Sequence, residues 1–357
     1  MRHLRDGTSA FPAMLAAIAC AKKEVLLEMY WIGADRVGRQ FRDALAERAK
    51  QGVSVFVLYD FIGSFETGSH FWQLAIDAGV IVRQFSPISP FSHGFRPRHI
   101  FNRDHRKMLI VDESCGFAGG INIGEAWAPP DAPQDAWRDD AIEVHGEPAQ
   151  MLRAAFLDVW QKLSGIPAAA ITLRPIQPSR VRVLTNTIEP RPNRAIRRAY
   201  LRAIRQATKS IDIANAYFLP GPLFLYAIRQ AARKGVRVRI LVPEHSDVFV
   251  AGLAMSSLYG RLLTDGAEVF AYLPRILHSK TAIFDGRLTM IGSHNLDALS
   301  WRFDLECDIA VDSEELAKLV HDSFERDLTE SRQLDLNVWR SRHWSLRLLA
   351  WLAALFR

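Results

Sequence analysis

The stretch His105-Arg106-Lys107-Met108-Leu109-Ile110-Val111-Asp112 decides the fold, because the chain repeats its pattern as His278-Ser279-Lys280-Thr281-Ala282-Ile283-Phe284-Asp285. Each copy reads His-x-Lys-x-x-x-x-Asp, and each is followed at the same distance by a turn of small residues that ends in asparagine. A lone copy of this pattern should occur by chance in roughly a few per cent of chains of this length. Two copies, each with its turn in register, indicate two equivalent halves.

The apolar run after each His-x-Lys predicts a short buried strand. Residues two apart lie on the same face of a strand, so each half would present a histidine beside a lysine. Phosphoryl transfer from a diester needs a nucleophile on one side and a proton donor behind the leaving oxygen. We therefore expect the two histidines to face each other across an interface, while the lysines hold the non-bridging oxygens. The four predicted catalytic residues are His105, Lys107, His278 and Lys280.

The other motif positions predict supporting contacts. A carboxylate can orient a catalytic imidazole or balance its charge, which is the role expected of the two motif aspartates. The asparagine that ends each turn would donate its amide to the phosphate, and the small turn residues would let the backbone approach closely. These positions are Asp112, Asn122 and Gly120 in the first half and Asp285, Asn295 and Ser293 in the second.

Composition favours an enzyme with anionic partners. The chain has 357 residues, 49% of them apolar, which is enough for a large core and two domains. A net charge of +6 and a pI near 9.3 favour a membrane surface, phospholipid head groups or nucleic acid. No run of basic and aromatic residues resembles a nucleic-acid module, so no nucleic-acid partner is expected. Three scattered cysteines argue for a reducing compartment, and no zinc spacing is present, so no metal or other cofactor is expected.

The order of apolar segments predicts two copies of one plan in which strands alternate with helices. We expect a first half at residues 1–164, a proline-rich linker at 165–179, a second half at 180–335 and an amphipathic tail at 336–357. Ser9 is expected to cap the first helix, and a loop at 86–98 to form the rim of the site. The predicted helices are 10–22, 36–51, 71–78, 149–162, 193–209, 223–233, 249–265 and 314–329. The predicted strands are 25–30, 53–59, 80–85, 108–111, 115–118, 141–144, 211–217, 236–242, 268–272, 281–284, 288–291 and 307–311.

The paired motifs resemble the signatures of the phospholipase D superfamily, and further segments are similar to bacterial cardiolipin synthases. These segments are Tyr30, 60–64, 102–107, 119–125, 137–139, 215–220, 292–297 and Glu306. The resemblance implies an α/β fold of two duplicated sandwich halves, with helices flanking mixed sheets and a pseudo-twofold active site at the seam. It also implies a metal-independent phosphohistidine mechanism and favours His105 as the nucleophile. In this family an acidic residue after each motif supports the opposite half-site, and Asp139 and Glu306 occupy those places.

The function implied by the resemblance is a phosphatidyltransferase that forms cardiolipin from phosphatidylglycerol and a second phospholipid. Two alternatives stay open: a hydrolytic phospholipase D or other phosphodiesterase, and a catalytically silent membrane scaffold. The amino-terminal transmembrane helices of many such synthases are missing. This difference predicts a peripheral protein on the cytoplasmic side of the cell membrane, bound to anionic phospholipids.

Several side chains keep two interpretations. Two tyrosines could line the site or pack beneath it, and three arginines could contact phosphate or only solvent; these residues are Tyr30 and Tyr217, and Arg103, Arg106 and Arg302. Four histidines are assigned no chemistry, namely His93, His99, His294 and His343. The tail is rich in tryptophan, leucine and arginine, so it could lie in a membrane interface or dock on the body of the protein.

Overall fold

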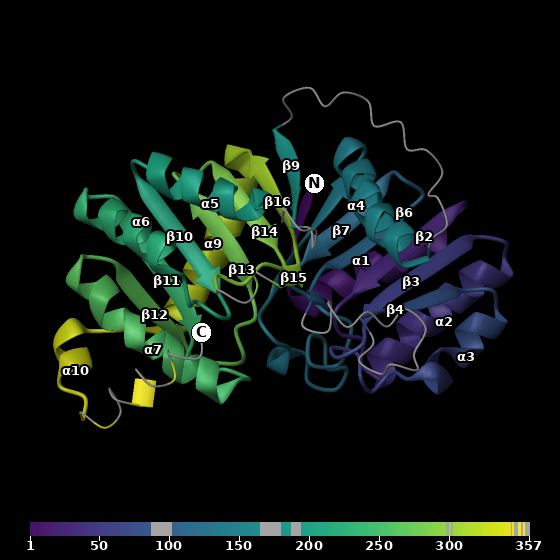
Figure 1. Ribbon diagram of the computed structural model, residues 1–357, viewed down its shortest axis with the longest axis horizontal. Helices are drawn as coiled ribbons and strands as arrows, with labels where there is room; N and C mark the ends of the chain where they lie inside the picture. The colour runs from purple at the N-terminus through teal and green to yellow at the C-terminus, as the bar shows by residue number, and fades with distance from the viewer. Residues whose placement is uncertain are drawn as a thin grey trace.

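The computed structural model describes residues 1–86, 102–164, 180–186, 194–297, 300, 303–343, 345, 349, 350 and 353. Each half of the chain builds one mixed sheet flanked by helices, and the two halves lie side by side (Figure 1). The sheet orders are β1-β8-β7-β6-β2-β3-β4 and β17-β12-β11-β10-β13-β14-β16-β9, and a two-stranded ladder, β15-β5, joins the halves. The predicted fold class is therefore confirmed.

The first half starts with a strand that the sequence analysis did not predict. Its elements are β1 (Arg2–Arg5), α1 (Asp6–Cys20), β2 (Glu24–Met29), α2 (Arg36–Lys50), β3 (Ser54–Asp60), α3 (Ser69–Asp77), β4 (Ile81–Phe85), β5 (Arg103–Asp104), β6 (Lys107–Val111), β7 (Cys115–Gly119), β8 (Asp140–His145) and α4 (Glu147–Ser164), with a 3₁₀ turn at Pro133–Asp135. β2, β3 and β4 are parallel, and β6 runs antiparallel to β2. Every residue of β6 is buried, which explains its continuous apolar run.

The second half repeats this plan. Its elements are β9 (Val181–Thr185), α5 (Ala195–Gln206), β10 (Ser210–Asn215), α6 (Pro222–Arg233), β11 (Arg237–Pro243), α7 (Phe249–Thr264), β12 (Glu268–Tyr272), β13 (Lys280–Phe284), β14 (Leu288–Gly292), β15 (Asp304–Leu305), β16 (Cys307–Asp312), α9 (Glu314–Thr329), β17 (Ser331–Gln333) and α10 (Leu336–Arg340). β10, β11 and β12 are parallel, and β13 runs antiparallel to β10 as β6 does to β2. The duplication in sequence is thus a duplication in topology.

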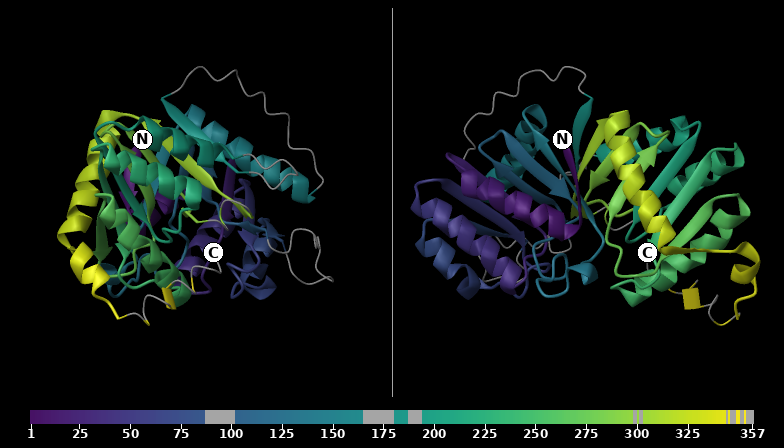
Figure 2. Two further views of the ribbon diagram at one scale, coloured as in Figure 1. Left: turned by 60° about the vertical axis from the view of Figure 1, so that its left-hand side comes forward. Right: turned by 180° about the vertical axis from the view of Figure 1, so that it is seen from behind.

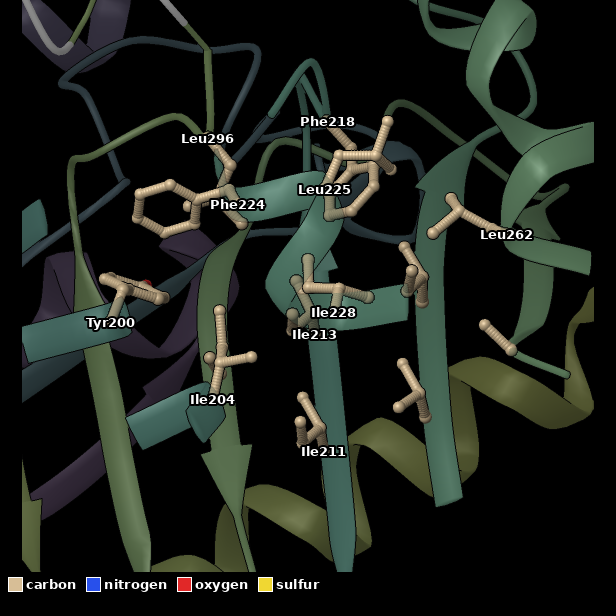
Figure 3. Packing of buried hydrophobic residues seen from close by; sticks show 14 of the residues in the cluster. Tyr200, Ile204, Ile211, Ile213, Phe218, Phe224, Leu225, Ile228, Leu262 and Leu296 are labelled. Atoms are coloured by element: carbon tan, nitrogen blue, oxygen red, sulfur yellow. The ribbon is translucent and has the colours of Figure 1, made fainter. Parts of the chain in front are cut away.

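Each sheet buries its two faces in different ways. In the second half, α5, α6 and α7 cover one face and pack apolar side chains such as Ile228 and Leu262 on the strands (Figure 3). The opposite faces of the two sheets share one further cluster, to which α4 contributes Phe156 and α9 contributes Val320. Seen from behind, α1 and α9 each lie over their own sheet (Figure 2). The shared cluster is the seam between the halves.

The structure corrects the predicted start of the chain. The first helix begins at Asp6, so Ser9 lies inside it and donates its hydroxyl hydrogen bond to the carbonyl oxygen of Arg5 instead of capping the helix. The preceding strand β1 pairs antiparallel with β8, from Arg2 opposite Glu143 to Arg5 opposite Asp140. Four residues with three basic side chains gave no apolar pattern to detect. The expected rim loop beyond residue 86 and the linker at 165–179 lie outside the described residues.

The described part of the tail lies on the second half. Trp339 of α10 stacks obliquely on Tyr259 of α7 with ring centroids 5.3 Å apart, and the guanidinium of Arg342 lies 3.2 Å above the Trp339 ring. Ala350 is buried, and Ala353 packs against the core of this half. Among the described residues no helix has the length and apolar character needed to cross a bilayer.

Candidate active site

Short ladders that cross the seam place the two histidines. β15 pairs in parallel with β5, and the backbone N–H of His105 donates to the carbonyl oxygen of Leu305 at 2.9 Å. On the other side Arg138 bridges Leu277, and the N–H of His278 donates to the carbonyl oxygen of Arg138 at 2.7 Å. Each ladder ends one residue before an acidic side chain. The backbone therefore holds each histidine against a carboxylate of the opposite half.

His105 pairs with Glu306 of the second half. Nδ1 of His105 lies 3.0 Å from Oε1 of Glu306, and the other carboxylate oxygen accepts a short hydrogen bond from the Ser293 hydroxyl. Burial raises the pKa of Glu306 well above its usual value. Burial and the neighbouring cations Lys107 and Lys280 hold the pKa of His105 well below 6.5. His105 is therefore neutral at physiological pH in the free protein.

His278 pairs with Asp139 of the first half. Nδ1 of His278 lies 2.7 Å from Oδ2 of Asp139, which also accepts a hydrogen bond from Nε1 of Trp127 at 3.0 Å. The backbone N–H of Asp140 donates to the other oxygen at 2.8 Å. Gly120 makes room for this carboxylate, because a Cβ there would lie 2.2 Å from Oδ1 of Asp139. Gly120 and Ser293 occupy equivalent turn positions. The glycine leaves space for the carboxylate of Asp139, whereas the serine donates a hydrogen bond to Glu306.

The two motif lysines are almost fully buried beside their histidines. Nζ of Lys107 donates to the carbonyl oxygen of His105 at 2.6 Å, and Lys280 makes the same short contact with the carbonyl oxygen of His278. Burial lowers the pKa of Lys107 to about 7 and that of Lys280 to about 8. The ring of Tyr30 lies 4.9 Å below Nζ of Lys107 and 4.8 Å from the His105 ring. A phosphate between the halves would meet both cations.

The two turn asparagines differ in their contacts. Oδ1 of Asn122 accepts a hydrogen bond from the backbone N–H of Trp31 at 3.1 Å, which leaves only its amide nitrogen for a ligand. Asn295 is 5% exposed, and its Oδ1 has no hydrogen-bond partner among the described residues. A buried amide without a full set of partners indicates a place for a ligand or water.

The structure does not bring the motif aspartates to the histidines. Asp112 follows the far end of β6, where its carboxylate accepts hydrogen bonds from the backbone N–H groups of Lys22 and Lys23 at 2.8 and 2.7 Å. The carboxylate of Asp285 likewise accepts hydrogen bonds from the backbone N–H groups of Lys209 and Ser210 at 2.8 and 3.0 Å. Both aspartates have positive φ, 50° and 53°, so they shape equivalent turns. The expected role of orienting an imidazole is corrected, because each lysine begins a five-residue strand and its aspartate follows the other end.

Burial settles the interpretation of Arg106. Arg106 is 1% exposed and donates to the carbonyl oxygen of Asn186 at 2.9 Å, so it contacts neither a head group nor solvent. In the other half the equivalent Ser279 donates to Oδ2 of Asp140 at 2.6 Å. The sequence analysis missed Asp140 and Trp127 as neighbours of the site. The tandem acidic pair Asp139-Asp140 was the available signal, because neighbouring residues of an extended chain point to opposite sides.

An open pocket lies beside His105, and His278 is not among the described residues that line it. Its volume is about 340 Å³, and both tyrosines of uncertain role, Tyr30 and Tyr217, line it. The lining also includes Arg103, which forms an ion pair with Asp60 at 3.3 Å. Arg302, His93 and His99 lie outside the described residues. His294 is buried at 0% exposure, and His343 is exposed on the tail.

One group of possible metal ligands lies among the described residues, away from this site. Ligand atoms of Cys115, Glu143 and His145 lie within 4.8 Å of one another. Cys115 pairs with His145 at the end of the β7–β8 ladder opposite to Gly119. Glu143 already forms ion pairs with Arg2 and His145 at 2.6 and 3.0 Å. The sequence analysis did not predict this surface group, because the pairing of two strands creates it.

The duplicated halves and the paired His-Lys motifs at their seam define the phospholipase D-like class of phosphatidyltransferases. A family profile described as "Cardiolipin synthase, PLD-like domain" matches residues 200–328. The chain is 32% identical over 338 residues to the probable cardiolipin synthase YwiE of Bacillus subtilis (strain 168), an alignment that covers 94% of this chain and 67% of that protein. It is 32% identical over 355 residues to a cardiolipin synthase of Geobacillus sp. (strain WCH70), covering 98% and 70%. The chain belongs to the cardiolipin synthase family.

A solved structure shows the same fold at lower sequence similarity. The phosphatidylserine synthase of Haemophilus influenzae Rd KW20 superposes with a TM-score of 0.72 at 16% identity, covering 99% of this chain and 93% of that one. At that identity the likeness concerns the fold, including the arrangement of two halves along one chain.

Proposed function

We propose that this protein forms cardiolipin by transferring a phosphatidyl group from phosphatidylglycerol to a hydroxyl group of a second phospholipid. The observation that carries the proposal is the crossed pairing at the seam, in which each histidine meets a carboxylate of the opposite half. The histidine of one pair attacks phosphorus, and the histidine of the other pair transfers a proton to or from the alcohol. The names of the relatives supply the lipid product.

The reaction takes two displacements. In the first, Nε2 of one imidazole attacks phosphorus, the phosphorus–oxygen bond to the head alcohol breaks, and the other imidazole gives the leaving oxygen its proton. In the second, that imidazole takes the proton of the acceptor hydroxyl, whose oxygen displaces the histidine from phosphorus. Each acidic side chain faces Nδ1 of its histidine, so Nε2 is the ring nitrogen left for chemistry. Nζ of Lys280 lies 3.1 Å from Nε2 of His278. Lys107 and Lys280 stabilise the charge on the non-bridging oxygens.

We infer that the protein works as a peripheral protein on the cytoplasmic surface of the membrane. Apolar side chains are exposed on α7 beside the pocket and, separately, in the turn after β3. Phe249 of α7 and Phe65 of that turn are both 76% exposed. The net charge of +6 favours an anionic lipid surface.

The test is to incubate purified protein with vesicles of labelled phosphatidylglycerol, with and without phosphatidylethanolamine, and to resolve the lipid products. We expect the diphosphatidyl lipid with release of a small alcohol. His105→Ala and His278→Ala should each lower turnover by several orders of magnitude, and the double variant should lose little more. Phosphatidic acid as the main product in acceptor-rich vesicles would instead identify a hydrolase. Near-normal turnover in either single variant would contradict the two-half site.

A further inference from the structure

The residue that follows β1, Asp6, holds the backbone of the acidic partner of His278. The backbone N–H of Asp6 donates to the carbonyl oxygen of Asp139 at 2.9 Å. In return, Oδ1 of Asp6 accepts a hydrogen bond from the backbone N–H of Asp139 at 3.1 Å. The peptide groups on both sides of Asp139 are therefore bound to a single residue far away in the sequence.

Gly7 contacts a second residue that holds Asp139. A Cβ at Gly7 would lie 2.5 Å from the backbone carbonyl oxygen of Trp127, so only glycine lets the first turn of α1 approach this loop. Nε1 of Trp127 donates to Oδ2 of Asp139 at 3.0 Å. Asp6 and Gly7 thus reach both the backbone of Asp139 and the indole that holds its carboxylate.

The carboxylate of Asp6 also binds the segment that carries His278. Nη2 of Arg275 donates to Oδ2 of Asp6 at 2.9 Å, and Nη1 donates to the carbonyl oxygen of Ala136 at 2.6 Å. Arg275 lies three residues before His278 in the chain. Through this arginine, Asp6 is connected to both members of the His278–Asp139 pair.

The position of Asp6 is costly for an aspartate. Its φ of 62° lies in the left-handed region, which residues other than glycine seldom adopt. Asp6 is also only 6% exposed, and a buried carboxylate is unfavourable unless it is paired. The bonds to Arg275 and Asp139 offset this cost. A strained, buried residue that the surrounding structure holds in place is typical of positions near a functional site.

The second half contains only part of this arrangement. Asn186 follows β9 as Asp6 follows β1, and its backbone N–H donates to the carbonyl oxygen of Glu306 at 3.2 Å. Oδ1 of Asn186 has no hydrogen-bond partner among the described residues. The backbone bond is therefore common to both halves, whereas the carboxylate that binds back to the acidic residue belongs to the first half.

We propose that Asp6 is a positioning residue, which holds Asp139 so that its carboxylate meets Nδ1 of His278. The proposal goes beyond the proposed function, and its kinetic test rests on that function. Asp6 contacts no reacting atom and acts through Asp139. Its loss should therefore slow the chemical step, measured as kcat, and leave the KM for the lipid unchanged.

The kinetic experiment compares two substitutions of Asp6. Asp6→Gly keeps the left-handed backbone and removes the carboxylate, whereas Asp6→Asn keeps an oxygen that accepts from the N–H of Asp139. Asp6→Gly should lower kcat for phosphatidyl transfer about 10- to 100-fold, and Asp6→Asn should recover most of it. In an Asp139→Asn background, Asp6→Gly should have little further effect, because the two residues act as a unit.

Asp265→Gly is the matched control. The side chain of Asp265 is 6% exposed against 8% for Asp6, and it pairs with Arg229 and Arg233 away from the seam. This variant should lower the melting temperature and leave kcat per folded molecule unchanged.

Nuclear magnetic resonance reads the pair without turnover. In resting protein with ¹⁵N-labelled histidine, the ring signals of His278 are identified by their absence in His278→Ala. These signals should shift in Asp6→Gly and stay in place in Asp265→Gly, because only the first variant moves the acidic partner of the ring.

Several outcomes would overturn the role of Asp6. These are a kcat for Asp6→Gly equal to that of the control, a kcat for Asp6→Asn as low as that of Asp6→Gly, a full further loss in the Asp139→Asn background, and unshifted His278 signals. If the intact protein forms no transfer product, the proposed function fails, and the His278 signals still decide whether Asp6 positions the pair.

Discussion

The two histidines have chemically different partners. Burial raises the pKa of Glu306 well above its usual value, whereas Asp139 accepts three hydrogen bonds, including one from Trp127. A carboxyl group with a raised pKa is more readily protonated and neutral. Replacing it by a neutral amide therefore changes its charge less. The two half-sites are therefore similar in geometry but differ in the hydrogen bonds that hold their acidic side chains.

This difference predicts unequal losses. Asp139→Asn should lower kcat/KM for phosphatidyl transfer by roughly 10² to 10⁴, because the imidazole loses the carboxylate that stabilises its cation. Glu306→Gln should lower kcat/KM by a clearly smaller factor. The measurement is initial-rate kinetics on mixed vesicles, with melting curves to confirm folding. Equal losses in the two variants would contradict this difference between the half-sites.

The lysines predict the alkaline side of the pH profile. Burial lowers the pKa of Lys107 to about 7 and that of Lys280 to about 8, so each loses its positive charge as the pH rises through that value. The kcat/KM, which reports the free enzyme, should fall across this range. The kcat should fall only at higher pH, because bound phosphate raises the lysine pKa values.

A matched variant tests this interpretation. Lys107→Arg keeps its charge at any of these pH values, so its loss of kcat/KM should begin near the pKa of Lys280, about 8. If kcat/KM of this variant falls at the same alkaline pH as in the unmodified protein, a group other than Lys107 controls the fall.

At the scale of elements, the helices and strands of the repeated plan were predictable because their apolar patterns are long and continuous. The strands β1, β5, β9, β15 and β17 were not predicted, since each has five residues or fewer and is fixed by a partner far away in sequence. Of these, β5 and β15 position His105. The motif aspartates were misassigned for a related reason: sequence spacing places them near the lysines, but an extended strand carries them to the other end of the sheet.

The corrected role of the aspartates predicts a change in stability without a change in chemistry. Asp112→Ala should lower the free energy of unfolding by roughly 1–2 kcal/mol, because backbone N–H groups of residues 22–24 lose their acceptor. Per folded molecule, kcat should be unchanged. Denaturant unfolding and kinetics measure both, and Asp131→Ala, at a 91% exposed side chain, is the control. A large loss of kcat with normal stability would restore the catalytic role.

The described tail residues favour docking on the body over an interfacial anchor. Trp339→Ala should lower the melting temperature, because the indole loses its contacts with Tyr259, Gly260 and Arg342. Val338→Ala is the matched control, since Val338 is 65% exposed on the same helix. Unchanged melting combined with weaker binding to anionic vesicles would instead identify an anchor.

At the scale of the whole molecule, the duplicated motif was enough to predict two halves and a shared site at their seam. It could not predict the inequality of the half-sites. That inequality depends on single positions where the halves differ, such as Gly120 against Ser293 and Arg106 against Ser279. It also depends on the pocket beside His105, which residues of both halves line and to which α7 contributes Val250, Ala251 and Ala254. The repeated sequence pattern predicts the features that the two halves share. The differences between the half-sites arise from the packing of residues that the pattern does not include.

The central claim is that transfer proceeds by two displacements at one phosphorus, the first by a histidine and the second by the acceptor hydroxyl. Each displacement inverts the configuration at phosphorus, so the pair retains it. The most direct measurement uses a donor lipid made chiral at phosphorus with oxygen isotopes and determines the configuration of the product by phosphorus NMR. Retention of configuration is the predicted result. Inversion would show a single direct displacement and would contradict the account.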